Sequence, residues 1–266
     1  MKCVAVGFMA LAMSAASLAT DVAPATYRLD LFHTGGKDTE IFAIDRLRLE
    51  PLPWPGHPSR ATDDGTSGVY RFEVRAADGQ LLQARGYASI FGEWVTTEQA
   101  QQQHRTFHES LRFPAPAKPG PVQVRIYRRD AQQVFQPLWE TKLDTTDMFV
   151  DRSPTAPQEL IAIEQHGTAA DKVDLLLLGD GYTAAECATK FRADAGRVSA
   201  ALFKVQPFAR RRQDFNVWGL CPPAAESGVS RPATDIHRAS PAGATYDAFG
   251  SERYLLTFEN RALREI

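Results

Sequence analysis

The sequence predicts a two-part protein: an all-β sandwich over residues 21–155, followed by an incomplete α/β domain over residues 156–266. Two observations support this prediction. From residue 21 to about residue 150, short segments alternate apolar and polar side chains, as strands with one buried and one solvated face do. From Lys172 to Phe203, an unbroken apolar run, a glycine loop and a helical pattern follow one another, which is typical of an α/β unit.

Residues 1–19 have the features of a secretory signal peptide. Lys2 precedes an apolar stretch from Val4 to Ala19, and Ser17-Leu18-Ala19 fits a small-x-small cleavage site. The apolar stretch is short for a membrane span. We therefore expect an exported protein, secreted or periplasmic, with no membrane span.

The composition is that of an ordinary globular protein. The 266 residues are 44% hydrophobic and 23% charged, with a formal net charge of −2. This balance gives no electrostatic reason to expect a nucleic-acid partner. Cys3 leaves with the signal peptide, so Cys187 and Cys221 remain. A disulfide between them and two buried free thiols are both open, because the sequence does not fix their separation.

The strands predicted in the first part follow from period-2 alternation. The alternating segments are residues 27–31, 47–49, 70–74 and 122–126, and the segment 135–139 is expected to pair with the last of them. Asp78-Gly79 supplies a hairpin turn before a return strand from Leu82 to Tyr87. A helical turn is expected from Thr97 to Gln103, and a domain boundary is expected near residue 155. Several short strands separated by turns predict a β-sandwich.

The second part begins with a strand from Leu160 to Glu164 and a leucine-rich strand from Val173 to Leu178. The unbroken apolar run of the second strand predicts burial on both faces, as in a parallel sheet. A loop at Gly179-Asp180-Gly181 follows, and Thr183 with Glu186 forms a capping box. The helix that starts there is expected to bury one face, made of Ala188, Phe191, Ala195, Val198 and Leu202.

A strand from Asp214 to Leu220 completes a strand–helix–strand unit. A long turn-rich segment from Pro222 to Glu252 and a helix from Tyr254 to Ile266 follow it. A sheet with so few strands does not complete a core, so we expect this chain to be a fragment or a truncated product.

Asp180 lies at the carboxyl end of the leucine-rich strand, where open sheets bind ligands. A catalytic or ligand-orienting role and a role in capping the helix or shaping the turn are both open. Ser227, followed by Asp235 and His237, has the residue order of an esterase triad, but the G-x-S-x-G elbow is absent. A loop serine that hydrogen-bonds the backbone is the alternative.

Two further patterns resemble a metal site and a dinucleotide site, but each lacks a residue that the site requires. His104 and His108 have the spacing of a zinc pair, but Arg105 stands where a zinc peptidase needs its glutamate base. Gly179-x-Gly181 lacks the third glycine of a dinucleotide site. We expect no metal ligand and no cofactor within this chain.

Several segments together resemble the IgA-peptidase family of bacterial secreted zinc metallopeptidases. In the first part they are residues 86–94 (GYASIFGEW), 105–110 (RTFHES) and 113–114 (FP). In the second part they are residues 178–183 (LGDGYT), 207–208 (PF), 215–217 (FNV), 226–228 (ESG) and 249–256 (FGSERYLL). The resemblance implies a β-sandwich ahead of the opening of a metallopeptidase-like α/β domain.

The family's zinc-binding H-E-x-x-H helix is absent from these 266 residues. The resemblance therefore implies the N-terminal portion of an exported zinc endopeptidase, inactive alone, with zinc expected in full-length relatives and a protein or glycoprotein substrate. No catalytic residue is assigned. Asp180, Glu226 and Ser227 are the candidate cleft-lining residues. The alternative is a non-enzymatic exported protein whose sandwich binds a glycan or a protein through Trp54, Trp94 or Trp139.

Overall fold

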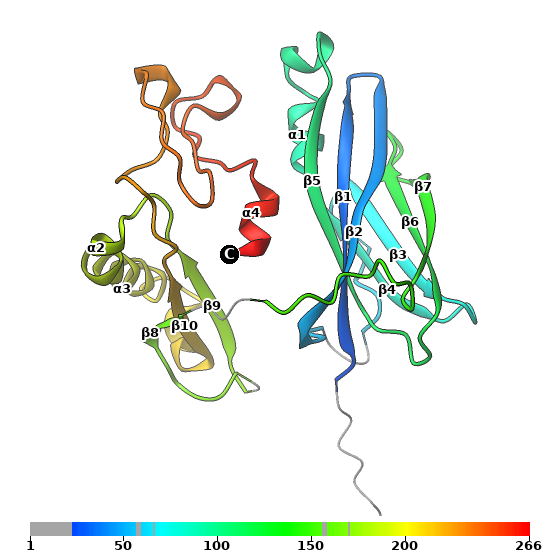
Figure 1. Ribbon diagram of the computed structural model, residues 1–266, viewed down its shortest axis with the longest axis horizontal. Coiled ribbons are helices and arrows are strands. Elements are labelled where there is room, and N and C mark those ends of the chain that lie inside the picture. The colour runs from blue at the N-terminus through cyan, green and yellow to red at the C-terminus, as the bar shows by residue number, and fades with distance from the viewer. Residues whose placement is uncertain (1–22, 57–59, 66, 156–158, 170) are drawn as a thin grey trace, which may run out of the picture.

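A computed structural model describes residues 23–56, 60–65, 67–155, 159–169 and 171–266. The predicted signal peptide, residues 1–19, lies outside them. The described residues form two parts, with the C-terminal helix between them (Figure 1). The domain boundary near residue 155 stays a prediction.

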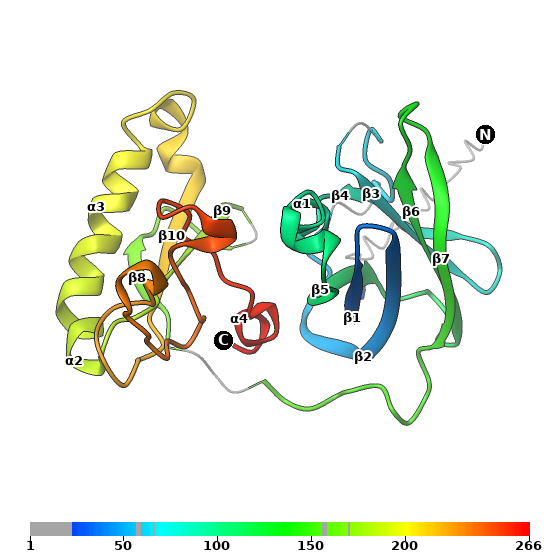
Figure 2. The ribbon, with the colours of Figure 1, turned by 90° about the horizontal axis from the view of Figure 1, so that it is seen from above.

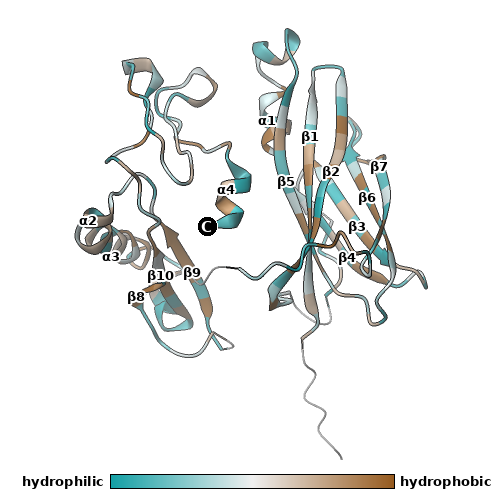
Figure 3. Ribbon diagram, in the orientation of Figure 1, coloured by the Kyte–Doolittle hydropathy of each residue, from teal (hydrophilic) through white to brown (hydrophobic). Residues whose placement is uncertain are grey.

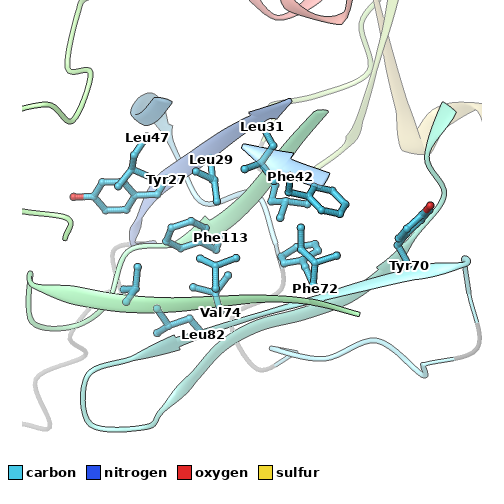
Figure 4. Close-up of a cluster of buried hydrophobic side chains, with 14 of the residues drawn as sticks. Tyr27, Leu29, Leu31, Phe42, Leu47, Tyr70, Phe72, Val74, Leu82 and Phe113 are labelled. Atoms are coloured by element: carbon cyan, nitrogen blue, oxygen red, sulfur yellow. The ribbon is translucent and has the colours of Figure 1, made fainter. Parts of the chain in front are cut away.

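The first part consists of two antiparallel sheets. One has the order β2-β1-β5, from Thr39–Pro53, Ala25–Gly36 and Arg105–Pro114. The other has the order β4-β3-β6-β7, from Leu81–Tyr87, Tyr70–Ala76, Pro121–Arg129 and Phe135–Asp144. Their inner faces meet in one core, where Leu29, Val74 and Phe113 are fully buried (Figure 4). The prediction of a β-rich first part is confirmed, including the hairpin at Gly79, whose φ is 86°.

A second apolar cluster lies beside the sheets. It contains Phe91 and Trp94 of helix α1 (Ile90–Trp94), Ala100 of a 3₁₀ turn (Glu98–Gln101), and Phe107 of β5. The turn lies within the predicted range, whereas α1 was not predicted because five residues are too short to show a helical period. Trp94 is completely buried, so it is not available as a binding platform.

The outer face of β1 contradicts the expected solvated face. Arg28 is 4% exposed and Asp30 is fully buried. Asp30 accepts hydrogen bonds from Arg28 and Arg46, at 2.9 Å from each Nε atom. β1 is the central strand of its sheet, and ion pairs of Asp30 with Arg28 of the same strand and with Arg46 of β2 compensate its burial.

The second part contains a three-stranded sheet of order β8-β10-β9, from Ile161–Glu164, Phe215–Leu220 and Val173–Leu178. β9 runs parallel to β10, and β8 is antiparallel to it. Helix α2 (Ala184–Glu186), a π-helical turn (Cys187–Phe191) and helix α3 (Arg192–Leu202) connect β9 to β10, with a 3₁₀ segment (Ala209–Asp214) before β10. The predicted strand–helix–strand order is present, and the metallopeptidase-like fold stays a prediction. Among the described residues, no helix is long and apolar enough to cross a membrane.

The predicted burial of the leucine-rich strand on both faces is wrong. β9 lies at the edge of its sheet, and Val173 and Leu176 are 55% and 49% exposed. Figure 3 shows the hydrophobic colour of this strand at the side of the sheet that faces the C-terminal helix. An apolar run in the sequence cannot distinguish a central strand from an edge strand. The position of a strand in its sheet depends on which other segments pack beside it, and those segments are distant in the sequence.

The predicted buried face of the following helix is also partly wrong. Phe191 and Ala195 are buried, but Ala188 and Val198 are exposed, and Ser199 is buried instead. The π-helical turn at Cys187–Phe191 is the reason, since its wider turn shifts the face that follows. Downstream of it, buried residues recur at positions 191, 195, 199 and 203.

The helix predicted from Tyr254 to Ile266 is shorter than expected. Helix α4 covers only Asn260–Glu265, and 3₁₀ turns lie at Pro232–Thr234 and Ala248–Gly250. Leu256 instead exchanges two backbone hydrogen bonds with Thr245, at 2.8 and 3.0 Å. Those contacts hold the segment before α4 extended. Figure 2 shows α4 between the sheet of the second part and strands β1, β2 and β5.

Candidate functional site

The loop between β9 and α2, residues 179–183, lies at the carboxyl end of the parallel strands, as predicted. Asp180 in this loop accepts three hydrogen bonds, from Ser240 Oγ (2.7 Å) and from the backbone N–H groups of Ala242 and Ala244 (2.9 Å each). Its carboxylate therefore fixes the segment 240–244 and does not cap the helix. With three donors in place, Asp180 is a structural anchor in this state of the molecule.

The next residues of the loop make further contacts with the long segment after β10. The carbonyl of Gly181 accepts from Gly228 N–H at 2.7 Å, and that of Tyr182 accepts from Ala224 N–H at 2.7 Å. A Cβ atom on Gly181, whose φ is 73°, would lie 2.5 Å from the Gly228 carbonyl oxygen. This close approach requires glycine.

The predicted capping box is present and reaches the same segment. Thr183 N–H donates to Glu186 at 2.9 Å, and the Ser227 hydroxyl donates to the other carboxylate oxygen of Glu186 at 2.9 Å. The hydrogen bonds from the Thr183 backbone and from Ser227 lower the pKa of Glu186. We call residues 179–187, with their partners in residues 221–244, the loop hub.

A disulfide between Cys187 and Cys221 is part of the loop hub. The sequence left a disulfide and two free thiols open for these residues, and the structure contains the disulfide. It closes a loop between residues 34 positions apart.

We expect the Cys187→Ser/Cys221→Ser double variant to lose about 3–4 kcal/mol of unfolding free energy, because the chain without the disulfide gains conformational entropy in the unfolded state. Urea unfolding of the variant and of the reduced wild type checks this. Equal stabilities of the oxidised and reduced wild type would contradict it.

A cavity of about 510 Å³ lies beside the loop hub. Asp180 and Tyr182 line it together with apolar side chains of β9, α3 and the C-terminal segment, among them Leu178, Val198 and Leu263. The other two candidate cleft-lining residues are not in its lining. Glu226 pairs with Arg238 at 2.8 Å, and Ser227 is held by Glu186. Asp194 also lines the cavity and accepts hydrogen bonds from the Tyr182 hydroxyl and from Arg197, at 3.1 Å each. Because both carboxylates are paired, the apolar part of the cavity can hold an apolar side chain.

The esterase-like order of Ser227, Asp235 and His237 does not assemble a triad. His237 Nε2 lies 3.4 Å from Asp235, and both side chains are largely solvent-exposed. The Ser227 hydroxyl donates to Glu186, so its proton has a carboxylate acceptor and no histidine contact in the described part of the chain.

Comparison with known families decides the identity of both parts. The family model described as Peptidase M64 N-terminus matches residues 20–140, and the one described as IgA Peptidase M64 matches residues 161–266. The chain belongs to the M64 family of IgA peptidases. No curated protein matches this M64 chain.

The described residues of this M64 chain do not fit a zinc site. They contain no group of three His, Cys, Asp or Glu side chains placed to hold a metal ion. His104 lies just before β5 and His108 lies within it, and His108 Nε2 is already 2.9 Å from Asp45.

The M64 N-terminal part and the peptidase part meet along the C-terminal segment. Phe258 packs against Phe107 of β5, with ring centroids 6.2 Å apart, and the Arg105 guanidinium lies 4.4 Å from the Phe258 ring centroid. Asn260 donates to the backbone carbonyl of His108 at 2.8 Å. We call this contact the seam.

Arg264 and His108 form the polar centre of the seam. Arg264 donates to His108 Nδ1 and to the His108 carbonyl. Because a guanidinium only donates, Nδ1 must be the acceptor, so Nε2 carries the proton that faces Asp45. Burial lowers the pKa of Arg264. Arg46 adds an ion pair with Glu265 at 3.0 Å.

Sequence reasoning missed the seam. The sequence pointed to His108 as half of a zinc pair and within the family-like segment 105–110, and it gave Arg264 no role. The contacts join residues 152 and 156 positions apart, and no local period or motif in one sequence reports such a pairing.

Proposed function

We propose that this chain is the N-terminal portion of an exported, zinc-dependent endopeptidase of the IgA-peptidase type. The first part serves as an accessory module that engages a protein or glycoprotein substrate. The segment 226–249 lines one side of the cleft of the complete enzyme, and Asp180 anchors it. The zinc ligands and the catalytic base are supplied by residues other than those of this chain.

The order of the two M64 family matches along the chain is the observation that carries this proposal. Two features of the structure support it. The loop hub fixes a long segment at the carboxyl ends of parallel strands, which is where α/β folds place their sites. The seam attaches residues 258–265, which follow that segment, to the first part, so the two parts are held in contact.

Sequencing the source DNA beyond the Ile266 codon tests the proposal directly. We expect an open reading frame that encodes H-E-x-x-H. A stop codon at that point would overturn the proposal and favour an exported binding protein.

Zinc titration of the purified chain is a second test. We expect neither tight binding of one zinc ion per chain nor cleavage of immunoglobulin A, with an H-E-x-x-H peptidase of known activity measured in parallel as the positive control. Tight stoichiometric zinc together with chelator-sensitive proteolysis would show that this chain is itself the enzyme.

A further inference from the structure

The first part contains a polar pocket that the proposed peptidase function does not use. It has a volume of about 630 Å³ and lies along β4, the edge strand of the four-stranded sheet (labelled in Figure 1). Its chemistry is carried by six side chains: Trp54, Arg60, Asp63, Asp64, Gln83 and Arg85.

Gln83 is the least expected member of this lining. It is 6% exposed, and within the described part of the chain no hydrogen bond reaches its side-chain amide. Its amide is not among the fully buried side-chain atoms without a partner, so it is open to solvent in the pocket. The amide lines a pocket large enough for a ligand, and a ligand that hydrogen-bonds it would replace its contact with solvent.

The charge available in the pocket is positive. Arg60 and Arg85 are exposed and form no ion pair within the described part of the chain. Asp63, in contrast, accepts hydrogen bonds from Gly86 N–H (2.6 Å), Gly65 N–H (3.0 Å) and Arg71 (3.3 Å). Asp64 also has a partner already. Two uncommitted guanidinium groups provide the donor geometry that a carboxylate accepts in pairs.

The walls of the pocket are fixed before any ligand arrives. Residues 61–63 pair with the outer edge of β4, through Ala84 N–H to the Ala61 carbonyl (2.6 Å) and Asp63 N–H to the Ala84 carbonyl (3.2 Å). Trp54 N–H donates to the Pro24 carbonyl at 2.7 Å. A Cβ atom on Gly56 would lie 2.4 Å from the Trp54 indole, so glycine lets the backbone lie against that ring. Such preorganisation reduces the entropy that a ligand must lose.

We propose that this pocket binds a pyranose sugar that carries a carboxylate. The Trp54 indole packs against the apolar face of the sugar ring, the Gln83 amide hydrogen-bonds its hydroxyl groups, and Arg85 and Arg60 pair with its carboxylate. The first part would then recognise an acidic sugar on a glycoprotein. This binding needs no peptidase activity, so it can be tested separately from the proposed function.

Calorimetric titration of the full chain with sialyllactose, and with neutral lactose, tests the proposal. We expect sialyllactose to bind about tenfold or more tightly than lactose, because only the former carries the carboxylate. Arg85→Gln and Trp54→Leu should each weaken sialyllactose binding by about tenfold. Arg210→Gln, an exposed arginine of the second part, is the matched control and should change nothing.

Gln83→Leu separates a ligand-binding role from a structural one. If the amide serves a ligand, this variant loses sialyllactose binding while its melting temperature changes little, because the amide hydrogen-bonds no described residue. A fall in melting temperature with unchanged binding would overturn the proposal. The absence of saturable binding by the wild type, or equal affinity for the two sugars, would also overturn it.

Discussion

Gly181→Ala lowers the unfolding free energy by about 3 kcal/mol or more, in our expectation, through strain and a backbone clash together. The φ of Gly181 is 73°, and the added Cβ would lie 2.5 Å from the Gly228 carbonyl oxygen, a backbone atom that cannot rotate away. Moving it apart would break the 2.7 Å hydrogen bond between Gly228 and Gly181. Urea unfolding measures the loss.

Two other glycines supply matched controls. Gly228 has a φ of 99° but nothing within 4 Å of an added Cβ, so Gly228→Ala tests the strain alone and should cost about 1 kcal/mol. Gly196, inside α3, also has open space and no positive φ, so Gly196→Ala should stabilise by up to about 1 kcal/mol. Equal effects at positions 181 and 228 would show that the clash contributes nothing.

His33→Leu is expected to cost about 3–5 kcal/mol, because it leaves buried carboxylates without their partner. His33 is fully buried, stacked between Phe42 and Phe91 at 4.1 and 4.0 Å between ring centroids. Its Nδ1 lies 2.9 Å from Glu109, and its Nε2 lies 2.9 Å from Glu40. Both nitrogens donate, so the imidazole is held in its charged form.

The same contacts predict how stability depends on pH. Burial opposes the charge on His33, but the hydrogen bonds with Glu109 and Glu40 outweigh it and raise the pKa of His33. A histidine whose pKa is higher in the folded state contributes its full stability below the unfolded value of about 6.5 and loses it as pH rises through the folded value. The wild type should therefore lose stability on the alkaline side, and His33→Leu should lose that part of the slope.

Unfolding curves at a series of pH values from about 6 to about 10 test this prediction. His237→Leu, at an exposed histidine, is the control and should change stability by no more than about 0.5 kcal/mol. Adding Glu109→Leu to His33→Leu should recover part of the loss, since an unpaired carboxylate is removed. A pH profile of His33→Leu identical to that of the wild type would contradict the charged imidazole.

Local patterns predicted the strands well where one face meets the core. Val122, Val124 and Ile126 alternate in the sequence and are all buried in β6. The capping box at Thr183 and Glu186 is likewise a local signal, and it is present. Such features depend on residues within one turn or two pleats of each other, so one sequence is enough to find them.

Features that depend on distant residues were not predictable in the same way. Asp30 reads as a solvated position on an alternating strand, and its burial depends on Arg46 of β2 as well as on Arg28 of its own strand. The sequence left Asp180 either a ligand-orienting role or a role in the local turn or helix cap, and its three donors come instead from residues 240–244. Whether Asp180, Glu226 and Ser227 line a catalytic cleft stays a prediction.

The loop hub has a consequence for proteolytic susceptibility. Long segments without regular structure are the usual places where proteases nick a folded protein, because the segment must leave the surface to enter a protease cleft. Here residues 221–244 are held at Cys221, Ala224, Ser227, Gly228 and the positions bound to Asp180. The longest stretch between two of these anchors, residues 229–239, is held by two backbone hydrogen bonds between Arg231 and Ile236 and by one from Tyr246 N–H to the Ser230 carbonyl. A segment that resembles an exposed linker in the sequence is therefore built to survive among proteases, and reduction of one disulfide would remove part of that protection.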